Sequence, residues 1–156
     1  MFVALSWIGG EGIVWLAIAL LLALLWRRPS VLVQVLVADV VADVLAYALK
    51  VAIGRDRPPV DYPRPKALVH VPHDGSFPSG HAAIAFACAT VLAASLPRYA
   101  VPLYVLAAAI AFSRVYVGVH YPLDVVGGAV LGVVVARALR WLSGALRRSP
   151  RATRAG

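Results

Sequence analysis

The sequence is poor in cysteine and in acidic residues. Its 156 residues include one cysteine, Cys88, and seven aspartates and glutamates, and charged residues of both signs make up 14%. A single cysteine excludes an internal disulfide and a zinc site built from cysteines. Soluble domains contain roughly 25% charged residues, so this chain has too few to cover the surface of a small soluble domain. We therefore expect it to lie in a lipid bilayer.

Long hydrophobic runs are what the sequence has instead. Hydrophobic residues make up 62% of the chain. A helix needs about 20 residues to cross the hydrocarbon core, so the length allows about five crossings. They are predicted at residues 1–26, 31–51, 79–96, 99–117 and 122–142. Between the second and third lie residues 54–77, which hold five of the eleven prolines and are predicted to form one long loop.

The expected fold is an all-α integral membrane bundle of five helices, or six if residues 1–10 form an extra surface helix. A single domain would cover residues 1–146, and the basic tail at residues 147–156 is predicted to be disordered. The first hydrophobic run has no basic segment before it and no small-residue cleavage site after it. We therefore expect it to be retained rather than removed as a signal peptide.

The 15 basic residues give a net charge of +8 and divide between the two ends of this bundle. Nucleic-acid modules do not bury basic residues among long apolar runs, so anionic lipid is the expected partner and nucleic acid is not. Nine basic residues lie at one end, which the positive-inside rule assigns to the cytoplasm: Arg27, Arg28, Arg98, Arg137, Arg140, Arg147, Arg148, Arg151 and Arg154. The C-terminus would then be cytoplasmic and the N-terminus outside.

The other six basic residues lie at the outer end, where this rule does not explain them: Lys50, Arg55, Arg57, Arg64, Lys66 and Arg114. Ends of four predicted helices meet there and also carry two histidines and a carboxylate, His81, His120 and Asp124. In a packed antiparallel bundle these ends form one layer. The sequence thus predicts an anion site with an acid and a base attached, at one membrane interface.

Two short segments sharpen this prediction. In Pro78-Ser79-Gly80-His81, a serine and a glycine at a helix start leave backbone amides free to approach an anion such as phosphate. His120 and Asp124 are four residues apart across the start of a helix. That spacing lets the carboxylate hold one ring nitrogen and leaves a lone pair on the other, as a nucleophile or a general base requires.

Three blocks of the sequence resemble the signature of the type 2 phosphatidic acid phosphatase superfamily. This superfamily includes membrane lipid phosphatases, bacterial acid phosphatases and vanadium haloperoxidases. The first block is Lys50, six residues, Arg57 and Pro58, and the second is Pro78-Ser79-Gly80-His81. The third is Ser113-Arg114, five residues, His120, three residues and Asp124. The blocks stand in the family's order and spacing, and the membrane helices disfavour a haloperoxidase.

The resemblance implies a role for each motif residue. Phosphoryl oxygens would be bound by Lys50, Arg57, Ser79, the Gly80 amide and Arg114. His120 would attack phosphorus to form a phosphohistidine, and Asp124 would orient it. His81 would protonate the leaving oxygen and then activate water. With three cations already present, neither a metal nor another cofactor is expected.

Other polar residues have less defined roles at this stage. Asp39 and Asp43 share a helix face with Lys50, and a structural hydrogen bond or ion pair, with Lys50 for example, is favoured over a catalytic role. Asp43 remains a candidate supporting residue of the site. His73 and Asp74 could touch a headgroup, although solvated loop residues are the commoner case. Ser113 is expected to be a hydrogen-bonding partner of the site.

The expected activity is metal-independent removal of phosphate from a membrane lipid at the outer face of the plasma membrane. A site that opens sideways to a leaflet and is covered by a compact loop suits a polyprenyl (undecaprenyl-type) diphosphate with a long thin tail. Phosphatidylglycerophosphate or phosphatidic acid is the alternative substrate. The alternative of another class is a lipid-phosphate binder or transporter without turnover, which would have no need of an oriented histidine.

Overall fold

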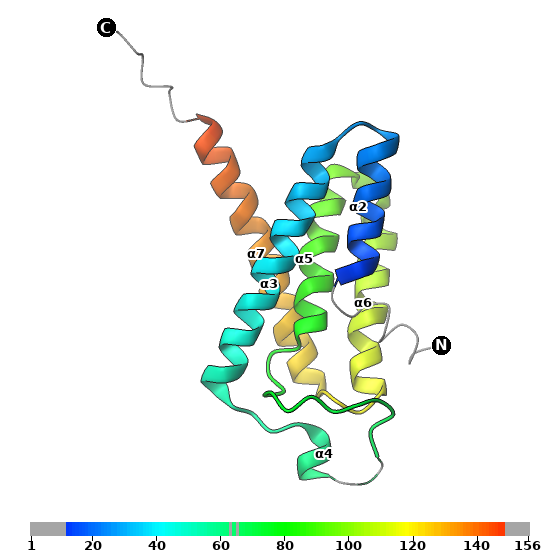
Figure 1. Cartoon of the computed structure of the whole chain (residues 1–156), viewed down its shortest axis with the longest axis vertical. Coiled ribbons are helices and arrows are strands. Elements are labelled where there is room, and N and C mark those ends of the chain that lie inside the picture. The colour runs from blue at the N-terminus through cyan, green and yellow to red at the C-terminus, as the bar shows by residue number, and fades with distance from the viewer. Residues whose placement is uncertain (1–11, 63, 65, 149–156) are drawn as a thin grey trace, which may run out of the picture.

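A computed structural model describes residues 12–62, 64 and 66–148, and in these ranges the chain contains helices and no strand. Figure 1 shows an elongated bundle joined at its lower end by one long loop. The α-helices are α2 (Ile13–Leu25), α3 (Pro29–Ile53), α4 (Pro58–Asp61), α5 (Gly80–Ser95), α6 (Ala100–Tyr116) and α7 (Pro122–Arg148). A short 3-10 helix, η2 (Pro97–Tyr99), joins α5 to α6. The predicted all-α class is confirmed.

Helix α5 forms the centre of the bundle and packs against α3, α6 and α7. It is rich in alanine, and Ala82, Ala83, Ala85 and Ala87 are completely buried. Small side chains let neighbouring helices approach closely, which is the main source of helix association where lipid removes the usual hydrophobic driving force. Because α5 is enclosed by other helices, it needs no polar face.

Glycines of α7 bring that helix into backbone contact with α5. A Cβ added at Gly128 would lie 2.3 Å from the Ser79 carbonyl oxygen, and one added at Gly132 would lie 2.2 Å from the Ala83 carbonyl oxygen. The two glycines are four residues apart and therefore face α5 together. Because Ser79 belongs to the second of the three blocks, Pro78-Ser79-Gly80-His81, called the second motif below, this close approach also fixes where that motif lies relative to α7.

Replacing Gly132 by alanine is expected to destabilise the bundle by about 1–3 kcal/mol, because the added methyl group meets backbone atoms that cannot rotate away. Thermal unfolding of purified protein in one detergent measures the change. Gly144→Ala is the matched control, since a Cβ at Gly144 meets nothing within 4 Å. Alanine favours helix over glycine, so the control should be unchanged or more stable. Equal melting temperatures for the two variants would contradict the close packing.

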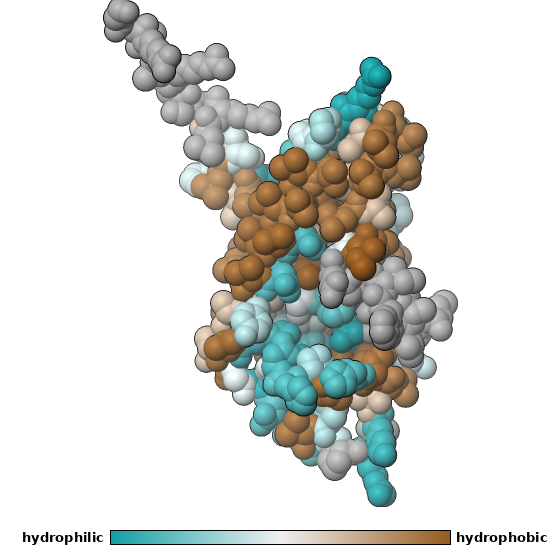
Figure 2. All heavy atoms as spheres, in the orientation of Figure 1, coloured by the Kyte–Doolittle hydropathy of each residue, from teal (hydrophilic) through white to brown (hydrophobic). Residues whose placement is uncertain are grey.

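Three stretches of the described chain are long and apolar enough to cross a bilayer: Pro29–Asp61, Pro97–Tyr116 and Pro122–Ala145. Figure 2 shows a broad hydrophobic area over the upper half of the molecule, with hydrophilic residues at the upper tip and over much of the lower half. Large apolar side chains such as Val44, Val105 and Val130 are exposed on these helices, as contact with lipid requires. The protein is an integral membrane protein.

The elements differ from the predicted ones in length. Helices α2 and α5 have 13 and 16 residues, fewer than the predicted first and third crossings. Residues 1–10, where a sixth helix was considered, and most of the predicted tail lie outside the described residues. Helix α7 runs to Arg148 rather than ending near Leu142, because no proline interrupts it before Pro150. The predicted loop contains helix α4, which starts at Pro58, a residue whose fixed φ suits a first helical position.

The two aspartates inside α3 lie beside the starts of other helices. A Cβ added at Gly12, which caps α2, would lie 2.0 Å from Asp39 Oδ1. A Cβ added at Gly80, the first residue of α5, would lie 3.7 Å from Asp43 Oδ1. Helix N-termini favour negative charge, so both carboxylates have a structural reason for their positions. The suggested partner Lys50 instead binds Asp74.

Candidate active site

Motif residues from distant segments meet at the lower end of the bundle in Figure 1, where α3 ends and α5 and α7 begin. Loop residues between α3 and α5 line this end. Ser76 ties the loop back on itself, since its backbone N–H donates to the Arg55 carbonyl at 2.8 Å and its hydroxyl to the Asp56 carbonyl at 2.8 Å. The loop therefore holds the first and second motifs side by side.

Arg57 is the best-connected side chain of this end. It is 3% exposed, and contacts account for each of the five N–H groups that a guanidinium carries. Three of these donate to backbone carbonyls: Nε to Asp74 at 3.0 Å, Nη2 to Gly75 at 3.3 Å and Nη1 to Val119 at 3.0 Å. The other two reach side chains, the Asp74 carboxylate at 2.6 Å and His120 Nε2 at 3.2 Å.

Asp74 links Arg57 to Lys50. Its Oδ1 accepts from Arg57 Nη2 and its Oδ2 from Lys50 Nζ, each at 2.6 Å. Partial burial by itself would raise the pKa of Asp74, but the hydrogen bonds and charges of Lys50 and Arg57 outweigh it and hold this pKa below its ordinary value. Asp74 is therefore a carboxylate anion between two cations, and not the solvated loop residue that the sequence favoured.

Asp124 is the buried carboxylate of the third motif, with a side chain that is 0% exposed. Its Oδ1 accepts from Arg55 Nη1 at 2.8 Å, and its Oδ2 accepts from the Tyr121 backbone N–H at 2.9 Å. His120 Nδ1 lies 3.5 Å from Oδ2. The Arg55 guanidinium also lies 4.4 Å from the centre of the Tyr121 ring. These contacts fix the carboxylate on the Nδ1 side of His120.

His120 is 3% exposed and lies between Asp124 on its Nδ1 side and Arg57 on its Nε2 side. Burial lowers the pKa of His120, the contact with Asp124 raises it, and the charges of Arg57, Lys50 and Arg114 lower it further, leaving it below the ordinary value. A neutral ring with its proton on Nδ1, toward Asp124, has a lone pair on Nε2. The arrangement can therefore supply a nucleophile.

The second motif begins helix α5. Ser79 is completely buried, its backbone N–H donates to the Asp124 carbonyl at 2.9 Å, and its Oγ has no hydrogen-bond partner among the described residues. Gly80 is buried as the first residue of the helix, and His81 follows it in the first turn. A buried hydroxyl without a partner costs free energy, so Ser79 Oγ is a candidate hydrogen-bonding group for a bound anion.

Comparison with known proteins assigns the family. A model of the PAP2 superfamily matches residues 30–148. The chain belongs to this superfamily. Its sequence is 36% identical over 125 residues to an undecaprenyl-diphosphatase of Sulfolobus acidocaldarius, covering 79% of this chain and 60% of that protein. It is 38% identical over 79 residues to a lipid A 1-phosphatase of Porphyromonas gingivalis, covering 48% of this chain and 18% of that protein. The chain thus spans less than two thirds of the length of either relative.

Two solved structures share the fold of this chain. A PAP2 type phosphatidylglycerolphosphate phosphatase from Bacillus subtilis superposes with a TM-score of 0.73 at 25% identity, covering 96% of this chain and 78% of that chain. LpxE of Aquifex aeolicus superposes with a TM-score of 0.74 at 28% identity, covering 88% of this chain and 81% of that chain. The likeness extends over nearly the whole bundle.

The remaining predicted residues of this PAP2 protein occupy distinct positions. Arg114 is buried in the last turn of α6, and its charge acts on His120. Ser113 donates its hydroxyl to the Ile110 carbonyl at 2.6 Å, so that group is engaged within its own helix. His73 is exposed on the loop, with its ring 6.1 Å from that of His70. Asp43 lies near the second motif, since a Cβ added at Gly80 would lie 3.7 Å from its Oδ1.

Two residues of the site were not singled out from the sequence, Arg55 and Asp74. Arg55 was one of the six basic residues at the outer end that the positive-inside rule does not explain. That unexplained position was a signal from which its place in the site could have been predicted. Asp74 was noted in the loop before the second motif, but its position is set by contacts to residues 17 and 24 positions away. With both included, four cations and two carboxylates leave this PAP2 site positively charged, as binding of a phosphate dianion requires.

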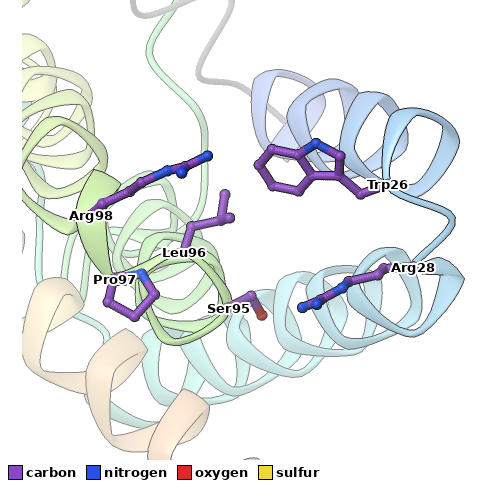
Figure 3. Close-up of a pocket in the computed structure, with 6 residues that line it drawn as sticks. All are labelled: Trp26, Arg28, Ser95, Leu96, Pro97 and Arg98. Atoms are coloured by element: carbon purple, nitrogen blue, oxygen red, sulfur yellow. The ribbon is translucent and has the colours of Figure 1, made fainter.

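A cavity of about 480 Å³ lies at the opposite end of the bundle, lined by Trp26, Arg28, Ser95, Leu96, Pro97 and Arg98. Figure 3 shows the Arg28 and Arg98 side chains on either side of it. Both arginines are close to the C-terminal end of α5, where the helix dipole favours cations. The cavity contains none of the motif residues of the PAP2 site.

Proposed function

We propose that this protein is a membrane lipid phosphatase that removes the terminal phosphate of a polyprenyl diphosphate through a phosphohistidine on His120. The observation that carries this proposal is the buried pairing of His120 with Asp124 on one side and Arg57 on the other. A protein that only bound phosphate would need the cations but not an oriented imidazole. PAP2 membership and relatives called undecaprenyl-diphosphatase or lipid A 1-phosphatase support lipid phosphate chemistry.

In the proposed first step, the Nε2 lone pair of His120 attacks the terminal phosphorus. The bond from phosphorus to the bridging oxygen breaks, and that oxygen leaves with the lipid monophosphate after taking a proton from His81. Phosphoryl transfer spreads negative charge over the equatorial oxygens. Lys50, Arg57, Arg114, the Ser79 hydroxyl and the Gly80 amide would stabilise that charge. Fixed donors of this kind are usually the largest single contribution to catalysis.

In the proposed second step, water attacks the phosphohistidine. His81, now neutral, takes the proton of the water, the P–N bond breaks, and inorganic phosphate is released with His120 restored. Asp124 stabilises the positive charge on the His120 ring during transfer, because it faces Nδ1 from a buried position. His81 regains the proton that it gave up in the first step, and the phosphoryl group passes from the lipid to His120 and then to water.

The outer face of the plasma membrane is the proposed location of the reaction. At the end of the bundle opposite the site, Arg27, Arg28 and Arg98 lie in the α2–α3 and α5–α6 connections, and the positive-inside rule assigns that end to the cytoplasm. Three of the cations at the site end, Lys50, Arg55 and Arg57, are engaged with Asp74 or Asp124. The site therefore explains the positions of these cations, and they do not count against the membrane orientation that the positive-inside rule assigns.

Phosphate release from three lipids tests the proposal. Purified protein in detergent with EDTA is given undecaprenyl diphosphate, phosphatidylglycerophosphate or phosphatidate at equal mole fractions, and kcat/KM is measured for each. Undecaprenyl diphosphate is expected to be the best substrate, and EDTA to leave the rate unchanged. A preference for phosphatidylglycerophosphate would reassign the substrate and keep the chemistry. No release from any of the lipids would contradict an enzyme and favour a lipid-phosphate binder.

A further inference from the structure

The anion that the two cations of the first motif bind in this structure is part of the chain. Lys50 and Arg57, called the cation pair below, each donate to one oxygen of the Asp74 carboxylate at 2.6 Å. A phosphoryl group would offer the same pair of cations two oxygens in the same way. Asp74 therefore occupies the cation pair that the proposed function gives to the phosphate of the substrate.

Substrate cannot bind to Arg57 without replacing a contact, because the five N–H groups of this side chain are already engaged. Three of its acceptors are backbone carbonyls that the fold holds in place. The two others belong to side chains, Asp74 and His120. In the reaction proposed above, His120 must turn its Nε2 lone pair from Arg57 to phosphorus, which frees one N–H of Arg57 for a phosphoryl oxygen. A second phosphoryl oxygen, bound by Arg57 Nη2, would enter where the Asp74 carboxylate now lies.

The Asp74 side chain can leave while its backbone stays. The Asp74 and Gly75 carbonyls accept from Arg57, and the next residue, Ser76, is bonded to Arg55 and Asp56. The side chain itself is 30% exposed, so rotation about its own bonds carries the carboxylate into water. No movement of the loop backbone is needed for the exchange.

We propose that Asp74 is an internal competitor of phosphate, which occupies the cation pair before substrate binds, yields it to the substrate and takes it back as inorganic phosphate leaves. The part of this inference that concerns turnover rests on the proposed function. Asp74 would limit how tightly both substrate and product bind. It would also keep the cation pair in position between reaction cycles, when two unpaired charges would repel each other.

Asp74→Asn is the decisive variant, because it removes the charge and keeps the shape. Binding of inorganic phosphate, measured by calorimetry, is expected to tighten about tenfold or more, the equivalent of one charge-assisted hydrogen bond no longer broken. In turnover, KM should fall and product inhibition by phosphate should strengthen. Damage to the site would weaken phosphate binding, so the direction of the change separates competition from a supporting role.

Two further variants control for charge and for folding. Asp61→Asn removes one negative charge at the same end of the molecule, but Asp61 contacts the Tyr121 hydroxyl and not the cation pair, so phosphate binding should be unchanged. Asp74→Glu restores the charge and should return the phosphate Kd toward that of the unmodified protein. Asp74→Ser repeats the test if the asparagine variant does not fold, as judged by thermal unfolding.

The outcomes separate the two proposals. Weaker or unchanged phosphate binding in the folded variants without the carboxylate would overturn the competitor role, and lipid hydrolysis by the unmodified protein would still stand. If the unmodified protein hydrolyses no lipid phosphate, the proposed function fails. The calorimetric comparison would still decide whether Asp74 competes with phosphate, because it requires no turnover.

Discussion

Replacing His120 by asparagine is expected to lower kcat for lipid diphosphate hydrolysis by about 10⁴-fold or more, as loss of the nucleophile does in other enzymes with covalent intermediates. Asparagine cannot form the phosphorylated intermediate. His120 contacts Asp124 through Nδ1 and Arg57 through Nε2, and no other ring in the described part of the chain has both contacts. Phosphate release in detergent is the measurement, and trapping of an acid-labile phosphoprotein from labelled substrate should be lost in parallel.

His70→Asn is the matched control for this experiment. His70 is an exposed loop histidine, so the same chemical change should leave both turnover and phosphoprotein trapping as they were. Full turnover by the His120 variant would exclude the phosphohistidine route. If turnover is lost and the melting transition also disappears, the asparagine variant has not folded. A second replacement, His120→Gln, would then be measured in the same assay.

Replacing Arg57 by lysine is expected to lower kcat/KM by about 10²–10³-fold, the scale of losing one preorganised donor to a developing oxyanion. The charge is kept, but an ammonium has three donors and no planar fork. It cannot hold the Asp74, Gly75 and Val119 carbonyls while also donating to a phosphoryl oxygen. Steady-state kinetics on the best lipid substrate provide the measurement, with kcat and KM reported separately.

Arg64→Lys is the control, since Arg64 is an exposed arginine of the same loop. It should show the rate of the unmodified protein. A rate for the Arg57 variant within about twofold of that of the control, a difference of less than 1 kcal/mol, would mean that the charge alone matters. The contacts of the guanidinium would then serve the loop and not the reaction.

Much of the site was predictable because its residues belong to short motifs at helix ends. Ser79 and Gly80 begin α5, and His120 and Asp124 flank the start of α7. Spacing of three or four residues determines which side chains share one turn, so the His120–Asp124 contact follows from local geometry. The sequence also predicted that four helix ends would meet, because short connections between apolar helices force an antiparallel bundle.

The positions of the loop residues could not be predicted in this way. Asp74 reaches Lys50 across 24 positions and Arg55 reaches Asp124 across 69. These pairings depend on how the loop folds back over the helix ends, and the loop has no regular period from which a direction could be inferred. The same limit applied to Asp39 and Asp43, whose neighbours are Gly12 and Gly80 rather than Lys50.

Sequence by itself determined that this chain lies in a membrane, that it is helical, and which motif residues gather at one end of the bundle, since hydrophobic length and motif spacing are properties of the chain read in order. Tertiary structure alone decided what those residues touch. Arg57 engaged at every donor, a carboxylate between two cations, and glycines of α7 against the backbone of α5 all arise from contacts between distant segments. Such contacts are fixed by packing, which no local pattern encodes.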